Sequence, residues 1–357
     1  MSRLLDIPVE LRELIIAHVV YSSTKPPSTP LELKGQEYYD LNYQAWVSGG
    51  TNVYYTQQDM PSSSKCLPLL LTNRQLSIET RALLERRKLD YIVDISVKNE
   101  LELFLTWQSV PRLTNHISTL YTNVRLFGPI IDMKTIRRQL GDGGRLGFHW
   151  SFYAALERFL RYGPVGEKPH HEGKGASRRG QYRDDLEEFR DQNILTDTLV
   201  MDFQSADLEL SFPPDNVTFR HWSDRHNGRD RWRSAGDISE TLSSYKPRPE
   251  WLCNYLGGWI NGILTMGYHV SWYGMPLYEN IGTIQLLVDG QLQFEIDLAS
   301  RLAGLRFTSP SGMMGHLPTG ERETGFWKWK RETLLRREAQ GFPVVWPSED
   351  EGRNERQ

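Results

Sequence analysis

The spacing of apolar residues near the start of the chain predicts an amphipathic helix. The stretch LLDIPVELRELIIAHVVY begins at residue 4 and repeats apolar side chains at three- and four-residue intervals, at Leu11, Leu14, Ile15 and Val19. These positions share one helical face, and Arg12 is expected on the opposite, polar side. Pro8 suits the first turn, where its missing N–H needs no partner. The apolar face therefore serves either the chain's own core or a docking partner.

A second amphipathic helix is predicted over residues 66–88, where Leu69, Leu76 and Leu83 are seven residues apart. Between the two helices, residues 22–65 are rich in Ser, Thr, Pro, Gly and Tyr. This composition predicts a long, partly ordered loop insertion. The first 90 residues are therefore expected to form a helical region that the insertion interrupts.

The remaining pattern alternates between strand and helix periods. Alternating β-branched stretches predict strands at 89–97, 117–127 and 195–203, and helices are predicted at 100–110, 133–140 and 152–162. Asp289 and Gly290 are expected to turn a β-hairpin within 283–298. Residues 163–185 read as a charged loop and 348–357 as a disordered tail.

This order of elements predicts an α+β (mixed α/β) fold. The expected architecture is an N-terminal helical pair packed on a mixed sheet with helical crossovers, followed by an irregular, aromatic-rich C-terminal half. We expect residues 91–347 to form one mixed α/β domain that contains any recognition region.

Composition narrows the function classes. The chain has 357 residues, is 39% hydrophobic and has a formal net charge of −3, so neither nucleic acid nor an anionic membrane is an expected partner. Cys66 and Cys253 are its two cysteines, which argues against a disulfide framework and suits a reducing compartment. No apolar run is long enough to cross a bilayer. A cytoplasmic or nuclear location is therefore expected.

Recognisable catalytic chemistry is sparse. The glycine turn at 141–147 lacks the spacing and the Lys-Ser/Thr of a phosphate-binding loop. His170, His171 and Glu172 could contact a metal, but they lie in the charged loop, where a solvated pair is the better interpretation. We therefore expect no catalytic site, no metal and no cofactor.

The C-terminal half is dense in aromatic residues, which give large contact areas with few rotamers to order. Four of them are the candidates for substrate recognition: Trp251, Trp259, Trp272 and Tyr273. Packing inside an irregular core is the alternative role for the same side chains.

Two segments carry a resemblance to a known family. LLDIPVELRELI resembles the start of an F-box, through Ile7, Pro8, Glu10, Leu11 and Ile15. The second segment, LPLLLTNRQLSIETRALL, is similar to the second helix of a large set of fungal F-box-like proteins, with Asn73 in place of the usual cysteine. The matching residues there are Leu71, Arg74, Gln75, Leu76, Glu79, Leu83 and Leu84.

The resemblance implies a role in ubiquitin transfer. An F-box docks a Skp-type adaptor, which links it to a cullin scaffold and a RING ubiquitin ligase, while the rest of the chain holds an unknown protein substrate. The implied adaptor-binding residues are Leu5, Ile7, Pro8, Leu11, Leu14 and Ile15. The implied contributors from the second helix are Leu69, Leu70, Arg74 and Leu76.

The expected function is therefore a non-catalytic substrate receptor of an SCF-type cullin-RING ubiquitin ligase. One alternative is an F-box-like scaffold that does not bind the adaptor, its leucines packing the two helices onto the sheet. The other is an enzyme whose site is assembled from scattered residues.

Overall fold

The computed structural model describes residues 4–30, 35–37, 52–56, 66–131, 147–164, 193–226 and 242–347. The helix predicted at 133–140, nearly all of the loop predicted at 163–185 and the tail predicted at 348–357 lie outside these ranges.

The described residues combine helices with one sheet. The helical segments are η1 (Leu4–Asp6), α1 (Val9–Val20), α2 (Leu67–Thr72), α3 (Arg74–Arg86), α5 (Phe148–Tyr162), α6 (Phe219–His226), α8 (Pro249–Ile263), α9 (Ser271–Asn280), α10 (Leu298–Gly304), η4 (Thr319–Glu321) and α11 (Arg322–Ala339). The strands are β1 (Gly35–Glu37), β2 (Val53–Thr56), β3 (Asp90–Lys98), β4 (Glu102–Ser109), β5 (His116–Phe127), β6 (Leu195–Ser205), β7 (Ile281–Val288) and β8 (Gln291–Asp297).

The strands form a mixed sheet in the order β1-β2-β4-β3-β5-β6-β7-β8. Strands β3, β5, β6 and β7 are parallel neighbours, and β4 and β8 pair antiparallel with β3 and β7. Helix α5 lies in the connection from β5 to β6, and α8 and α9 lie in the connection from β6 to β7. The predicted α+β class is therefore confirmed.

The structure corrects the predicted helix at residues 100–110 and adds two short strands to the partly ordered insertion. Residues 100–110, predicted as a helix, form β4, because Leu103, Leu105 and Trp107 alternate onto one face of the sheet and pair with β3. The insertion at 22–65 is more than a loop. Its residues 35–37 and 53–56 form β1 and β2, and β2 pairs in parallel with β4.

The predicted hairpin between β7 and β8 is confirmed. Asp289 and Gly290 have φ values of 47° and 76° and join β7 to β8. A two-residue turn with both residues at positive φ matches the right-handed twist of the strands.

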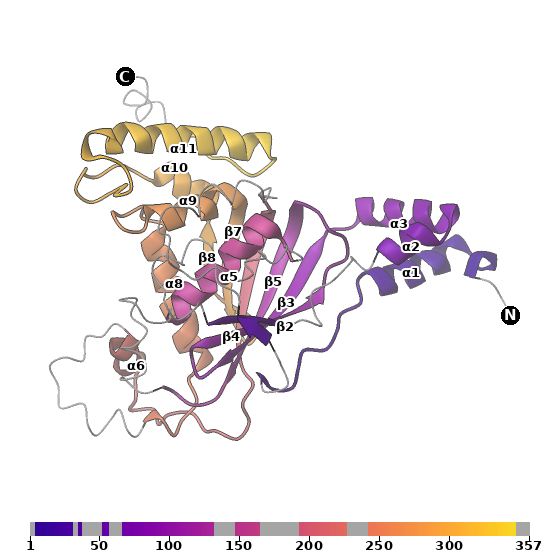
Figure 1. Ribbon diagram of the computed structural model, residues 1–357, viewed down its shortest axis with the longest axis horizontal. Coiled ribbons are helices and arrows are strands. Elements are labelled where there is room, and N and C mark those ends of the chain that lie inside the picture. Colours follow the sequence, from indigo (N-terminus) through magenta and orange to yellow (C-terminus); the bar gives the residue numbers. More distant parts are fainter. Residues whose placement is uncertain are drawn as a thin grey trace, which may run out of the picture.

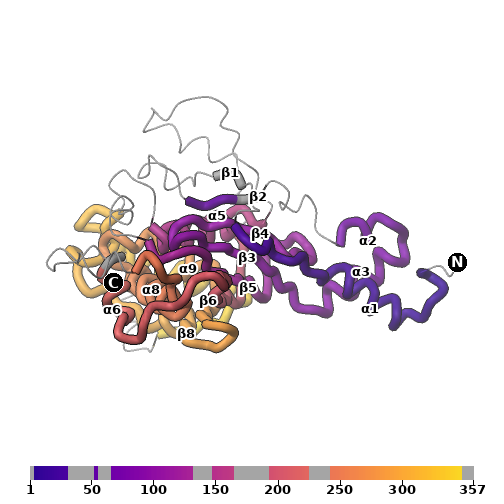
Figure 2. Tube along the Cα trace, turned by 90° about the horizontal axis from the view of Figure 1, so that it is seen from below, coloured from indigo at the N-terminus to yellow at the C-terminus, as the bar shows by residue number. Residues whose placement is uncertain are grey.

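One face of the sheet is covered by helices α5, α8 and α9 (Figures 1 and 2). Apolar side chains from both layers form the main core, and α11 adds Phe326 and Trp329 to it.

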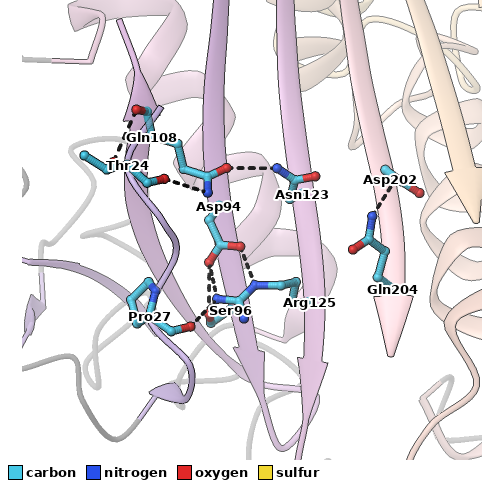
Figure 3. Close-up of polar contacts among 9 residues, drawn as sticks. All are labelled: Thr24, Pro27, Asp94, Ser96, Gln108, Asn123, Arg125, Asp202 and Gln204. Atoms are coloured by element: carbon cyan, nitrogen blue, oxygen red, sulfur yellow. Dashed lines mark hydrogen bonds and ion pairs between the residues drawn. The ribbon is translucent and has the colours of Figure 1, made fainter. Parts of the chain in front are cut away.

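The opposite face of the sheet carries a group of polar side chains on β3, β4 and β5, and a segment of the insertion crosses it (Figure 3). Arg125 pairs with the fully buried carboxylate of Asp94 and donates to the carbonyl oxygen of Pro27 at 2.8 Å. The backbone N–H of Thr24 donates to the carbonyl oxygen of Gln108 at 3.0 Å. We call residues 24–27 the strap, because these contacts fix them to the sheet.

Helices α1, α2 and α3, with η1, form an arm that projects from one end of the sheet (Figures 1 and 2). We use "arm" for residues 4–21 and 66–86. The arm has a small core of its own, made of Ile16, Ala17, Val20, Cys66, Leu76, Leu83 and Leu84. The predicted helical pair thus packs on itself and does not lie on a face of the sheet.

Candidate functional site

Helix α1 buries a different face from the one its leucine pattern indicated. Ile16, Ala17 and Val20 point into the arm core together with Arg12. The expected outward position of Arg12 was therefore wrong. Because α1 carries apolar residues on several sides, the spacing of its leucines alone does not determine which side is buried.

Arg12 is held inside the arm by several acceptors. Its Nη2 donates to Glu79 Oε1 of α3 at 2.6 Å and its Nε donates to Glu79 Oε2 at 2.9 Å. Its Nη1 donates to the carbonyl oxygens of Leu5 and Ile7. Hydrogen bonds from Arg12 above all, then from Gln75, lower the pKa of Glu79 below its ordinary value although burial opposes this. One guanidinium thus joins η1, α1 and α3.

The residues predicted to meet an adaptor lie on the outside of the arm. Leu11 is 51% exposed and Leu14 is 62% exposed. Leu5, Pro8 and Ile15 are also exposed, and Ile7 is half-buried. Val9 and Val19 of α1 add further exposed apolar surface. We call the group Leu5, Pro8, Leu11, Leu14 and Ile15 the outer face of the arm.

The second predicted helix is two helices that meet at Asn73. The Oδ1 atom of Asn73 accepts from the N–H of Leu76 at 2.9 Å and so caps α3. Of the residues assigned to this segment, Leu76 is buried in the arm core, Leu69 and Leu70 pack against that core, and Arg74 is exposed. Leu71 and Ile78 remain exposed.

The four aromatic candidates for recognition lie in three different places. Trp251 is buried and packs on Trp222 with ring centroids 6.0 Å apart, which favours the alternative role of packing inside the core. Trp272 is exposed and contacts the ring of His316. Only Trp259 and Tyr273, among these four, lie together.

Trp259 and Tyr273 belong to an aromatic cluster that joins three helices. Trp150 of α5 packs edge-on against Trp259 of α8 at 5.2 Å and against Tyr273 of α9 at 4.7 Å. Tyr153 of α5 contacts the same two rings. Burial raises the pKa of Tyr273, so its hydroxyl stays neutral in this environment.

An apolar cavity of about 50 Å³ lies beside this cluster, between the sheet and helices α5, α8 and α9. Strands β3 to β7 supply its floor, with residues such as Ile95, Leu120 and Met201. Ala155, Trp259 and other helical residues form its roof. The lining residues that the structure describes include no charged side chain. Sequence reasoning missed this cavity, because its walls come from eight separate elements.

Neither the cavity nor the arm assembles recognisable catalytic groups. Among the described residues, no three His, Cys, Asp or Glu side chains are grouped so that they could hold a metal ion. In the same part of the chain, no helix combines the length and apolar character that crossing a membrane requires.

The chain matches no protein-family model, no curated protein and no solved structure.

Proposed function

We propose that the arm docks a Skp-type adaptor and that the chain is a non-catalytic substrate receptor of a cullin-RING ubiquitin ligase. The observation that carries the proposal is the exposure of Leu5, Leu11, Leu14 and Ile15 on the outer face. These residues coincide with the positions through which the sequence resembles an F-box. The proposed place of action is the cytoplasm or the nucleus.

The arm has a core that does not include the outer face, and this favours a docking role for that face. Contiguous exposed apolar side chains on a small helical unit are typical of interaction surfaces. The arm does not need the outer face for its own folding, because Ile16, Val20 and Leu83 already form its core. Leucines that recur along one helix are suitable anchors for a groove in a partner.

The attachment of the arm supports a receptor that holds a substrate at a fixed distance from the ligase. Helix α3 runs directly into β3, and the strap anchors the exit of α1 on the sheet. The N–H of Cys66, at the start of α2, donates to the carbonyl oxygen of Pro111 at 3.3 Å. Three connections thus limit rotation of the arm against the sheet.

Capture of a purified fungal Skp-type adaptor by the full-length chain tests the proposal. We expect the Leu11→Asp/Leu14→Asp double variant to lose capture, because two charges would enter an apolar interface. The variant should fold, since both side chains are exposed in the free chain. Leu208→Asp is the matched control, because Leu208 is 93% exposed and lies outside the arm.

Three results are informative. Capture by the wild type and by Leu208→Asp, with loss in the double variant, supports the adaptor role. Equal capture by all three proteins shows that the adaptor binds elsewhere and contradicts it. No capture by a folded wild type also contradicts it, and would favour a scaffold that does not bind the adaptor.

A further inference from the structure

The cavity between the sheet and the helices is separate from the arm and does not depend on adaptor docking. Protein interiors are packed as densely as organic crystals, so an apolar space of about 50 Å³ between the sheet and its helices exceeds the gaps of ordinary packing. Its walls come from five strands and three helices. Because eight elements line the space, imperfect packing of a single helix does not account for it.

The chemistry of the walls defines what the cavity can accept. Hydrocarbon side chains predominate, and the described lining residues that carry a polar group are Thr122, Tyr153, Trp107 and Trp259. A carboxylate or an ammonium group would lose its hydration there without gaining a counter-charge. The walls therefore select a neutral, apolar molecule.

The cavity reaches the surface through aromatic residues. Trp107, Leu156 and Trp259 are half-buried, whereas Ala155 and most other lining residues are fully buried. Trp259 is held by the edge-on contacts of the α5–α8–α9 aromatic cluster. Trp107 packs on Phe159 with ring centroids 5.5 Å apart. Both indoles thus line the cavity and are also partly accessible to solvent.

We propose that this cavity is a binding site for a small, neutral, apolar ligand. Apolar cavities stay dry and take up small hydrocarbons, because the empty walls lack dispersion contacts. Such pockets bind by apolar contact and use a few polar groups for orientation. Here Thr122 and Tyr153 would supply that orientation, and the two tryptophans would form the entrance.

Bromoethane is a suitable probe, because it is small and neutral and its bromine quenches indole fluorescence on contact. We expect saturable quenching of part of the emission, since Trp107 and Trp259 are two of 11 tryptophans. Trp259→Phe should reduce the quenched fraction. Trp251→Phe is the matched control, because Trp251 is buried in the same helix but does not line the cavity.

A cavity-filling variant separates binding from surface quenching. Ala155→Leu places extra methyl groups into the space, and we expect it to weaken the probe at least about tenfold. If that variant does not fold, Ala155→Val replaces it. Unsaturable quenching that is equal in all variants overturns the proposal. Uptake of xenon without saturable binding of bromoethane also overturns it, because it identifies a packing void.

Discussion

A single buried arginine shows how side-chain chemistry decides the orientation of the first helix. The apolar residues of α1 could bury more than one face, but only the face with Arg12 brings its guanidinium to Glu79 and to the carbonyl oxygens of Leu5 and Ile7. An arginine is tolerated inside a small core when its donors are paired. The leucines at 11 and 14 are left outside as a consequence.

Replacement of Glu79 by Gln should destabilise the arm in a pH-dependent way. The pKa of Glu79 is lowered from 4.5, so the folded state favours the carboxylate more than the unfolded chain does. Its stabilisation is complete above pH 4.5 and is lost as the pH falls through the lowered pKa. Near neutral pH we expect Glu79→Gln to cost about 1–2 kcal/mol.

Hydrogen exchange of the arm amides measures this effect. The wild type should lose its advantage over Glu79→Gln as the pH is lowered. Glu13→Gln is the control, because the Glu13–Arg86 pair lies at the surface and exposed pairs contribute only about 0–1 kcal/mol. An equal advantage at every pH would show that the carboxylate charge is not the cause.

At the scale of elements, the break between α2 and α3 depends on one cap. Asn73→Ala removes the acceptor for the Leu76 N–H and should destabilise the arm by about 1 kcal/mol. Asn73→Ser keeps an acceptor and should retain most of that stability. Denaturant unfolding of the three proteins, followed by hydrogen exchange in α3, checks the prediction. Equal losses in both variants would mean that the cap contributes little.

Elements whose conformation is set by their own residues could be predicted from the sequence, whereas elements set by pairing with distant residues could not. The β7–β8 hairpin was predictable, since Asp289 and Gly290 carry the turn themselves. Strand β4 was not, because its Glu and Leu residues suit a helix and only pairing with β3 makes them a strand. The spacing of Leu11 and Leu14 left open whether they are buried or exposed, and the cavity unites residues as distant as Ile95 and Ile284.

At the scale of the whole molecule, the described residues form two separate cores of very different size. The arm core has seven buried apolar residues, and the main core extends from β2 to α11. Small cores are less stable than large ones, because less apolar surface is buried per residue. We therefore expect the arm to open at a lower free energy than the sheet and its helices.

Each core contains one buried cysteine, so thiol labelling can follow the two separately. Cys66 lies in the arm core and Cys253 in the main core, where burial raises the pKa of its thiol to about 12. In native buffer we expect Cys66 to react faster than Cys253, because local opening of the arm exposes it without global unfolding. Glu79→Gln should accelerate Cys66 alone. Labelling of both thiols at one common rate would show that the arm and the main core unfold as a single unit.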